Sequence, residues 1–252
     1  APKPSEMAVG VKELIELPAE VIEDRLLCGP GEGAAWLFAG DSTKGHIGGG
    51  FMYTNKSSIS LGLVATLSDL VTARTTIYQM MEDFKQHPEV AALIRGGKLV
   101  EYSGHMVSEG GYHMIPQLVG DGCLVAGDAG MLCMNLGYCV RGMDFAVASG
   151  QLAARAAIEA MDRKDFSASS LNRYKELLEG SFVLRDMRQY QRFPHFMEST
   201  KRIFNGYPAL VRDIFNGMFV VDGEPQPPLK KKVLDSAREV GFMNILKDVR
   251  GG

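Results

Sequence analysis

The sequence predicts a mixed α/β protein, on three observations. Short segments rich in apolar and β-branched residues, typical of strands, dominate the first 110 residues. A glycine-rich turn then opens a helix-periodic segment that runs from Gly142 to about Met161. The remainder is mostly helical in pattern. We therefore expect a sheet-rich stretch at 1–111, a mixed stretch at 112–162 and a helical stretch at 163–252.

Length and composition are those of a globular protein. The chain has 252 residues, 46% of them hydrophobic, which is enough for one large or two modest domains. A formal net charge of -3 gives no electrostatic reason to expect binding to nucleic acid. No signal-peptide pattern occurs, and no uncharged run approaches the roughly 20 residues that span a bilayer. We therefore expect a cytoplasmic protein.

The first stretch predicts an antiparallel sheet with a helical excursion. Tyr53–Ser58 has the composition of a hairpin turn. Thr75–Gln86 and Pro88–Ile94 are predicted as consecutive helices, broken at Pro88. The segments predicted as strands are Met7–Leu17, Ala34–Ala39, Gly49–Thr54, Ser58–Val64 and Lys98–Val107.

The mixed stretch predicts a ligand site where a strand meets a helix. Gly122–Ala126 lacks polar alternation, which predicts a strand that is covered on both faces, as in a parallel sheet. Asp128 follows its carboxyl end, where a carboxylate can accept hydrogen bonds from sugar-like hydroxyls such as those of a ribityl chain. The alternative is that Gly127–Gly130 is a simple turn and Asp128 binds loop amides.

The helix that follows is predicted to bring backbone N–H groups to the same ligand. Gly137 and Gly142 bracket its entry, and glycines allow a ligand ring to approach the backbone closely. The positive end of the helix dipole favours negative charge on that ring. We interpret the arrangement as half of a flavin site. The predicted packed face of the helix comprises Met143, Ala146, Val147, Gly150, Ala153, Ala154, Ala157 and Ile158.

The same residues carry a family resemblance. G-D-A-G, then Gly137, Gly142-Met143 and a small-residue helix, resembles the second FAD-contacting motif of a flavoprotein superfamily. That superfamily includes aromatic hydroxylases, geranylgeranyl reductases and electron-transfer-flavoprotein:quinone oxidoreductases. Over nearly the whole chain the sequence is similar to the FixC family, in the segments MAVGVKELIELP, GGGFMYTNKSSISLGLV, MMEDFKQHPEVAALIRGGKLVEYSGHMV, LVGDGCLVAGDAGMLCMNLGYCVRGMD and VGFMNILKD.

The resemblance implies the architecture and the cofactor. It implies an antiparallel-sheet substrate domain at 1–111, part of a Rossmann-like FAD-binding domain at 112–162, and a helical C-terminal region. Gly48–Tyr53 would line a pocket above the flavin, or the three glycines are only a strand entry. The implied cofactor-binding residues are Gly127, Asp128, Ala129, Gly137, Gly142 and Met143.

One departure concerns the other half of the cofactor. Superfamily members hold the ADP half of FAD on a G-x-G-x-x-G turn between a strand and a helix, and this sequence contains no such turn. Gly29–Gly33 is predicted to be a loop, because Pro30 interrupts it and no amphipathic helix follows. We therefore expect the C-terminal portion of a FixC-like protein, without the ADP-binding half.

The implied function is electron transfer from electron-transfer flavoprotein subunits through FAD to quinone or a ferredoxin-like partner. A flavin monooxygenase, a geranylgeranyl-reductase-like enzyme and a cofactor-free fragment without activity are the alternatives. No residue is assigned a catalytic role. The histidines and the four cysteines lack metal-ligand spacing, which predicts no metal site and fits a separate ferredoxin-like partner. Cys133 and Cys139 flank the predicted flavin loop. They are either redox groups or small buried hydrophobic residues.

The helical stretch contains one broad apolar face that is either core or a surface for a membrane or a partner. Lys230–Lys232 would then contact anionic lipid headgroups, or the three lysines are simply solvated. The first of these alternatives implies peripheral contact with the inner membrane. The apolar face comprises Phe204, Tyr207, Leu210, Val211, Ile214, Phe215, Met218 and Phe219.

Overall fold

A computed structural model describes residues 2–137 and 139–251, and the chain divides into two compact units. Unit 1 combines residues 2–9 with Thr66–Ser68 and His105–Pro194. Unit 2 combines Gly10–Ala65, Asp69–Gly104 and the residues from His195 onward. The units cut across the three stretches drawn from the sequence, whose functional roles remain predictions.

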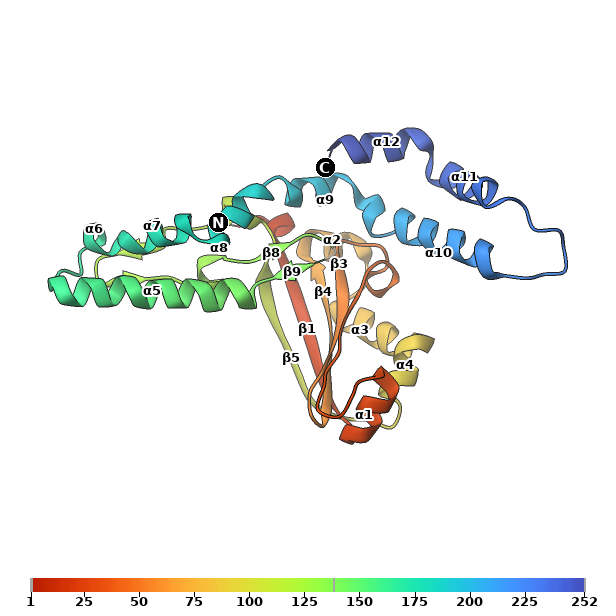
Figure 1. Cartoon of the computed structure of the whole chain (residues 1–252), viewed down its shortest axis with the longest axis horizontal. Helices are drawn as coiled ribbons and strands as arrows, with labels where there is room; N and C mark the ends of the chain where they lie inside the picture. The colour runs from red at the N-terminus through yellow and green to blue at the C-terminus, as the bar shows by residue number, and fades with distance from the viewer. Residues whose placement is uncertain (1, 138, 252) are drawn as a thin grey trace. The chain divides into compact units, whose positions relative to one another are not determined.

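A five-stranded sheet has the strand order β2-β3-β4-β1-β5 (Figure 1). β2 pairs with β3, and β3 with β4, in antiparallel register. The β3–β4 hairpin closes where the Asn55 N–H donates to the Ser58 carbonyl at 2.8 Å. All five predicted strands are confirmed within two residues of their predicted ends: β1 Met7–Glu16, β2 Ala35–Phe38, β3 Gly48–Thr54, β4 Ser58–Thr66 and β5 Lys98–Ser108.

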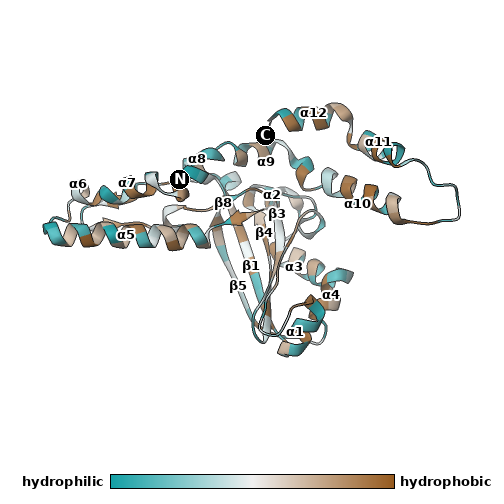
Figure 2. Ribbon diagram, in the orientation of Figure 1, coloured by the Kyte–Doolittle hydropathy of each residue, from teal (hydrophilic) through white to brown (hydrophobic). Residues whose placement is uncertain are grey.

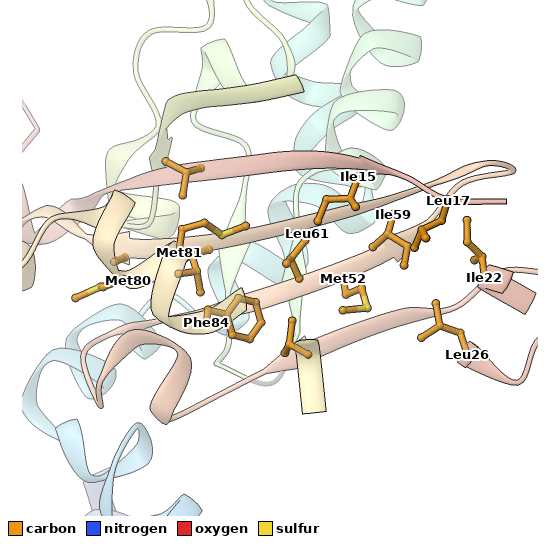
Figure 3. Close-up of a cluster of buried hydrophobic side chains, with 14 residues drawn as sticks. Ile15, Leu17, Ile22, Leu26, Met52, Ile59, Leu61, Met80, Met81 and Phe84 are labelled. Atoms are coloured by element: carbon orange, nitrogen blue, oxygen red, sulfur yellow. The ribbon is translucent and has the colours of Figure 1, made fainter. Parts of the chain in front are cut away.

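Helices cover one face of the sheet in unit 2 (Figure 3). Ile59, Leu61 and Leu63 alternate along β4 with no exposed surface, because successive strand residues point to opposite faces. Met80 and Phe84 of α3 pack against this row. The flanking helices are α1 Ala19–Leu26, α2 Leu67–Ala73, α3 Ile77–Gln86 and α4 Pro88–Ile94, of which α1 and α2 were not predicted from the sequence.

The glycines at the start of β3 are explained by close packing within the sheet. Gly48 has φ +143°, and a Cβ there would lie 2.0 Å from the Val64 carbonyl oxygen. A Cβ on Gly49 would lie 2.7 Å from the Phe38 carbonyl oxygen. Larger residues therefore do not fit at either position, as the strand-entry interpretation requires.

Unit 1 is built on the 21-residue helix α5, which packs beside α7 and α8 (Figure 1). Phe145, Tyr174 and Leu178 form the buried centre of this packing. Its elements are β6 Val119–Gly120, β7 Cys123–Leu124, β8 Met134–Asn135, β9 Val140–Arg141, α5 Met143–Arg163, α6 Ala168–Leu171, α7 Arg173–Gly180 and α8 Phe182–Gln189.

The buried parallel strand predicted at Gly122–Ala126 is wrong. The segment contributes only β7, which pairs with β6 in an antiparallel hairpin, and Cys123 is exposed. Asp121 and Gly122 form the two-residue turn, with Gly122 at φ +67°. Asp-Gly is a strong hairpin signal because glycine adopts the positive φ that Gly122 has in this turn without steric cost, and this signal outweighs the apolar run.

The predicted packed face of α5 is also wrong. Met143, Val147 and Ile158 are 83%, 74% and 59% exposed. The buried face instead comprises Phe145, Ser149, Ala156 and Ala160. The helix has two apolar faces, and only one of them packs against the described residues of unit 1.

The C-terminal helices of unit 2 leave half of the predicted apolar face exposed. Phe204 is buried, but α10 contains no buried residue, and Phe215 and Phe219 are 55% and 73% exposed. In Figure 2 the colour for hydrophobic residues recurs along the α10 ribbon. The core interpretation is therefore wrong for α10. No described helix combines the length and hydropathy needed to cross a membrane. The helices are α9 Phe193–Ser199, α10 Gly206–Phe219, α11 Leu229–Val240 and α12 Phe242–Gly251.

Candidate flavin site

The turn Gly127–Gly130 packs against the N-terminal half of α5. Gly127 is buried with φ +62°, and its N–H donates to the Ser149 Oγ at 3.0 Å. A Cβ at position 127 would lie 3.3 Å from the Cβ of Ala146. Glycine at this position therefore fixes the turn against the helix.

The Asp128 side chain lies beside the start of α5. Its Oδ1 is 3.8 Å from the position that a Cβ on Gly142 would occupy. Gly142 is the N-cap and offers no side chain to the first turn of the helix. The residue Asp128 is exposed, and none of the hydrogen bonds found between described residues uses its carboxylate. The alternative in which Asp128 caps loop amides therefore has no support.

The other predicted residues surround this point. Ala129 is exposed next to Asp128, and Met143 is the exposed first residue of α5. Gly137 has φ +75°, and its N–H donates to the Asn135 Oδ1 at 2.8 Å. The loop is thus held by a side chain that the sequence pattern did not single out.

A buried carboxylate, Glu109, supports the loop in unit 1. Glu109 is 6% exposed, and its Oε2 accepts a hydrogen bond from the Thr66 hydroxyl at 2.9 Å. Its Oε1 accepts one from the Asn135 amide at 3.0 Å. Glu109 therefore connects three segments that are distant in sequence, which is why a single-sequence pattern did not reveal it.

Cys133 lies beneath the same loop as a protonated thiol. Burial raises the pKa of this thiol to about 11, and the negative charges of Asp128 and Glu109 act in the same direction. The thiol donates a hydrogen bond to the Ser108 carbonyl. Because the thiolate is the reactive form, the buried-hydrophobe interpretation of Cys133 fits better than a redox role.

Arg141 fixes the entry to α5. Its guanidinium binds Asp144 and Asp186, both at 2.5 Å, and lies 4.4 Å from the ring centroid of Phe145. Such contacts pin the strand before the helix to α8. Arg141 could not be singled out from the sequence, because its second carboxylate is 45 residues away.

These residues fit the ribityl end of a flavin cofactor. Asp128 supplies an exposed acceptor that has no partner of its own among the described residues, and Gly142 leaves open the space beside it. The first-turn N–H groups of α5 supply donors and a positive dipole end. Within 2–137 and 139–251, no group of three or more His, Cys, Asp or Glu side chains is placed to hold a metal ion.

Unit 2 presents an aromatic surface on the sheet face opposite its core. Phe51 and Tyr53 alternate with the buried Met52, and their rings stack with centroids 5.1 Å apart. The Phe51 ring lies over Gly62, where a Cβ would be 2.2 Å away. Burial raises the pKa of Tyr53, so its hydroxyl keeps its proton and can donate a hydrogen bond. Leu37, paired with Phe51 in register, is 52% exposed.

Comparison with solved structures gives the class of fold. The chain resembles a geranylgeranyl bacteriochlorophyll reductase-like protein from Thermoplasma acidophilum with a TM-score of 0.54 and 15% identity. The match covers 99% of this chain and 56% of that one. The mixed α/β fold with an antiparallel sheet is therefore one that a reductase-like protein shares.

Sequence comparison gives the family. Residues 7–107 match the model "ETF-QO, ubiquinone-binding", and residues 193–252 match the "ETF-QO/FixC family C-terminal domain". The chain is 54% identical over 248 residues to the probable electron transfer flavoprotein-quinone oxidoreductase YdiS of Escherichia coli, and 53% identical over 246 residues to FixC of the same organism. The chain belongs to the ETF-QO/FixC family, as the motifs predicted.

The match covers 98% of this chain but only 58% of YdiS and 57% of FixC. The chain therefore spans a little over half the length of the curated relatives that it matches.

Proposed function

We propose that the chain forms part of a FAD-dependent oxidoreductase that passes electrons from an electron-transfer flavoprotein to quinone. The observation that carries the proposal is the exposed Asp128 carboxylate, unpartnered among the described residues, beside Gly142 at the start of α5 in a chain of this family. FAD, when bound, supplies the electron storage. Asp128 would accept ribityl hydroxyls, with Gly127 and Ala129 beside it. Gly137, Gly142 and Met143 would border the ring.

The quinone would bind on the aromatic surface of unit 2. The match of residues 7–107 to a ubiquinone-binding model supports this, as do the flat stacked rings of Phe51 and Tyr53. The Tyr53 hydroxyl, protonated at neutral pH, would donate to a quinone oxygen. The name of the relative YdiS, a probable electron transfer flavoprotein-quinone oxidoreductase, supports the electron-transfer flavoprotein as donor. A ferredoxin-like protein remains a proposed second partner, from the family resemblance alone.

The test uses a chimera in which this chain replaces the 248 matching residues of YdiS. The chimera is reduced chemically, and its reoxidation by a ubiquinone analogue is followed. Tyr53→Phe is expected to raise the KM for quinone about 2- to 10-fold, because one hydrogen bond is worth about 0.5–1.5 kcal/mol. Tyr78→Phe, an exposed tyrosine on α3, is the matched control and should change nothing. Quinone reduction that is indifferent to Tyr53 would contradict the quinone position, and no reduction at all would contradict the function.

Peripheral membrane contact is a proposal that the C-terminal helices of unit 2 support. Phe219, the last residue of α10, is 73% exposed, and Val221, two residues beyond it, is 87% exposed. Lys230 and Lys231 are exposed at the start of α11. Apolar and basic residues together suit an anionic bilayer surface, where quinones reside. Sedimentation with vesicles that contain phosphatidylglycerol tests this, and chain that stays in the supernatant contradicts it.

A further inference from the structure

The strand β2 has a free edge in unit 2. Among the described residues it is the first strand of its sheet and pairs with β3 alone. The Thr54 N–H donates to the Ala34 carbonyl oxygen at 3.1 Å, and in an antiparallel pair every second residue repeats this pattern. The backbone N–H and C=O groups of Ala35 and Leu37 therefore point away from β3. None of the backbone hydrogen bonds found between described residues outside the β2–β3 pairing uses them.

This edge lacks the features that normally protect an edge strand. Residues 33–40 contain no charged residue and no proline. The Trp36 and Leu37 side chains are 40% and 52% exposed. Natural proteins place lysine, proline or a covering segment at a free apolar edge, because such an edge pairs readily with another extended chain. The β2 edge is therefore suited to the addition of a strand.

A cavity of about 490 Å³ is lined by β2, α3 and α4, and we call it the β2 cavity. Its aromatic wall consists of Trp36, Phe38 and Phe84. The ring centroids of Trp36 and Phe38 lie 6.2 Å apart, and those of Phe38 and Phe84 lie 5.1 Å apart. Trp36 pairs in register with Met52, which belongs to the core under the helices. Because successive strand residues point to opposite faces, this wall is separate from the Phe51–Tyr53 surface.

The polar residues of the β2 cavity are mainly acidic. Three carboxylates line it against one lysine, Lys44. Asp83 pairs with the Lys44 Nζ at 2.5 Å, and the hydrogen bond lowers the pKa of Asp83. Asp41 and Glu89 are exposed, and none of the hydrogen bonds or ion pairs found between described residues uses their carboxylates. An arginine or lysine side chain suits this setting, because its stem packs on aromatic rings and its charged end reaches carboxylates.

We propose that β2 binds an extended segment of a partner protein as an added antiparallel strand, with an arginine or lysine of that segment in the β2 cavity. Ala35 and Leu37 would supply the backbone hydrogen bonds, and alternate side chains of the added strand would point into the cavity. A basic segment fits better than a second copy of this chain, because a second copy would bring its own Asp41 and Glu89 to the same edge. The inference depends on neither the flavin site nor the quinone site.

Fluorescence anisotropy with the 252-residue chain tests the proposal. The probe is a fluorescein-labelled peptide in which valine and arginine alternate, so that an added strand places every arginine on the cavity side. In an antiparallel strand in that register, the valine N–H groups face β2 and the arginine N–H groups face solvent. We expect saturable binding that weakens at least about tenfold when the valine amides are N-methylated, and that barely changes when the arginine amides are N-methylated. A peptide with glutamate in place of arginine should also bind at least about tenfold more weakly.

Variants of the chain locate the binding. Leu37→Pro removes an N–H from the free edge and leaves the β2–β3 pairing intact, so the arginine peptide should bind at least about tenfold more weakly. Leu37→Val keeps the N–H and is the matched control. Asp41→Asn together with Glu89→Gln should weaken binding about tenfold, whereas Glu20→Gln, at an exposed carboxylate on α1, should change nothing. If circular dichroism shows that Leu37→Pro is unfolded, the N-methylated peptides decide with the unmodified chain.

Several results would overturn the proposal. Absence of saturable binding, or equal binding of the two N-methylated peptides, would mean that no strand is added. Equal binding of the glutamate peptide would mean that the carboxylates do not select the ligand. A dimer in sedimentation velocity that Leu37→Pro dissociates would mean that a second copy occupies the edge. Binding should persist in the YdiS chimera, and its loss there would mean that the rest of the longer protein covers β2.

Discussion

Replacing Glu109 by leucine is expected to lower the free energy of unfolding by about 3 kcal/mol. The carboxylate is 6% exposed and accepts hydrogen bonds from Thr66 at 2.9 Å and Asn135 at 3.0 Å. Leucine has a similar volume but no acceptor, so both donors lose these bonds in a buried environment. The cost of burying the Glu109 charge itself offsets part of the loss, which keeps the net effect near this value.

Urea unfolding followed by circular dichroism measures the change. Glu101→Leu, within the preceding strand β5, is the control, because the Glu101 side chain is 54% exposed and the Lys12 Nζ is 3.9 Å away from its carboxylate. That variant should change the free energy by less than about 0.5 kcal/mol. A loss below about 1 kcal/mol for Glu109→Leu would show that the loop does not depend on this carboxylate.

Asp128→Ala is expected to weaken FAD binding to the YdiS chimera about 5- to 150-fold, which corresponds to about 1–3 kcal/mol for hydrogen bonds to a charged acceptor. The side chain is exposed and has no hydrogen-bond partner among the described residues, so its removal should not unfold unit 1. The loss should therefore appear in affinity and not in helicity. Titration of flavin-free chimera with FAD, followed by flavin fluorescence, measures it.

Asp162→Ala is the control for the loss of a negative charge, since Asp162 lies near the other end of α5 and is also exposed. It should bind FAD as the unmodified chimera does. Unchanged affinity in Asp128→Ala would remove this carboxylate from the cofactor site.

Local periodicity was sufficient to predict the sheet. The apolar residues Ile59, Leu61 and Leu63 alternate along β4, and the turn residues after Thr54 indicate the hairpin. Both signals depend only on residues that are close in sequence, because the two-residue period of a strand and the turn of a hairpin are local features. The position of the Gly127–Gly130 turn before a long helix was predictable for the same reason.

Packing between distant segments could not be predicted in this way. The apolar run Gly122–Ala126 is compatible both with a buried strand and with one arm of a hairpin. Only the Asp-Gly turn distinguishes these two structures. On α5 both faces are apolar, so periodicity did not reveal which one is packed in unit 1. Glu109 and Thr66 are 43 residues apart, and no local pattern pairs them.

The location of the flavin site is the central claim, and amide hydrogen exchange tests it most directly. The YdiS chimera is measured with and without FAD, and peptides that cover 127–143 are compared. Bound FAD should slow exchange in these peptides, because the backbone around Gly127, Gly137 and Gly142 would contact the cofactor. Unchanged exchange at 127–143, with FAD bound and protection elsewhere, would contradict the claim.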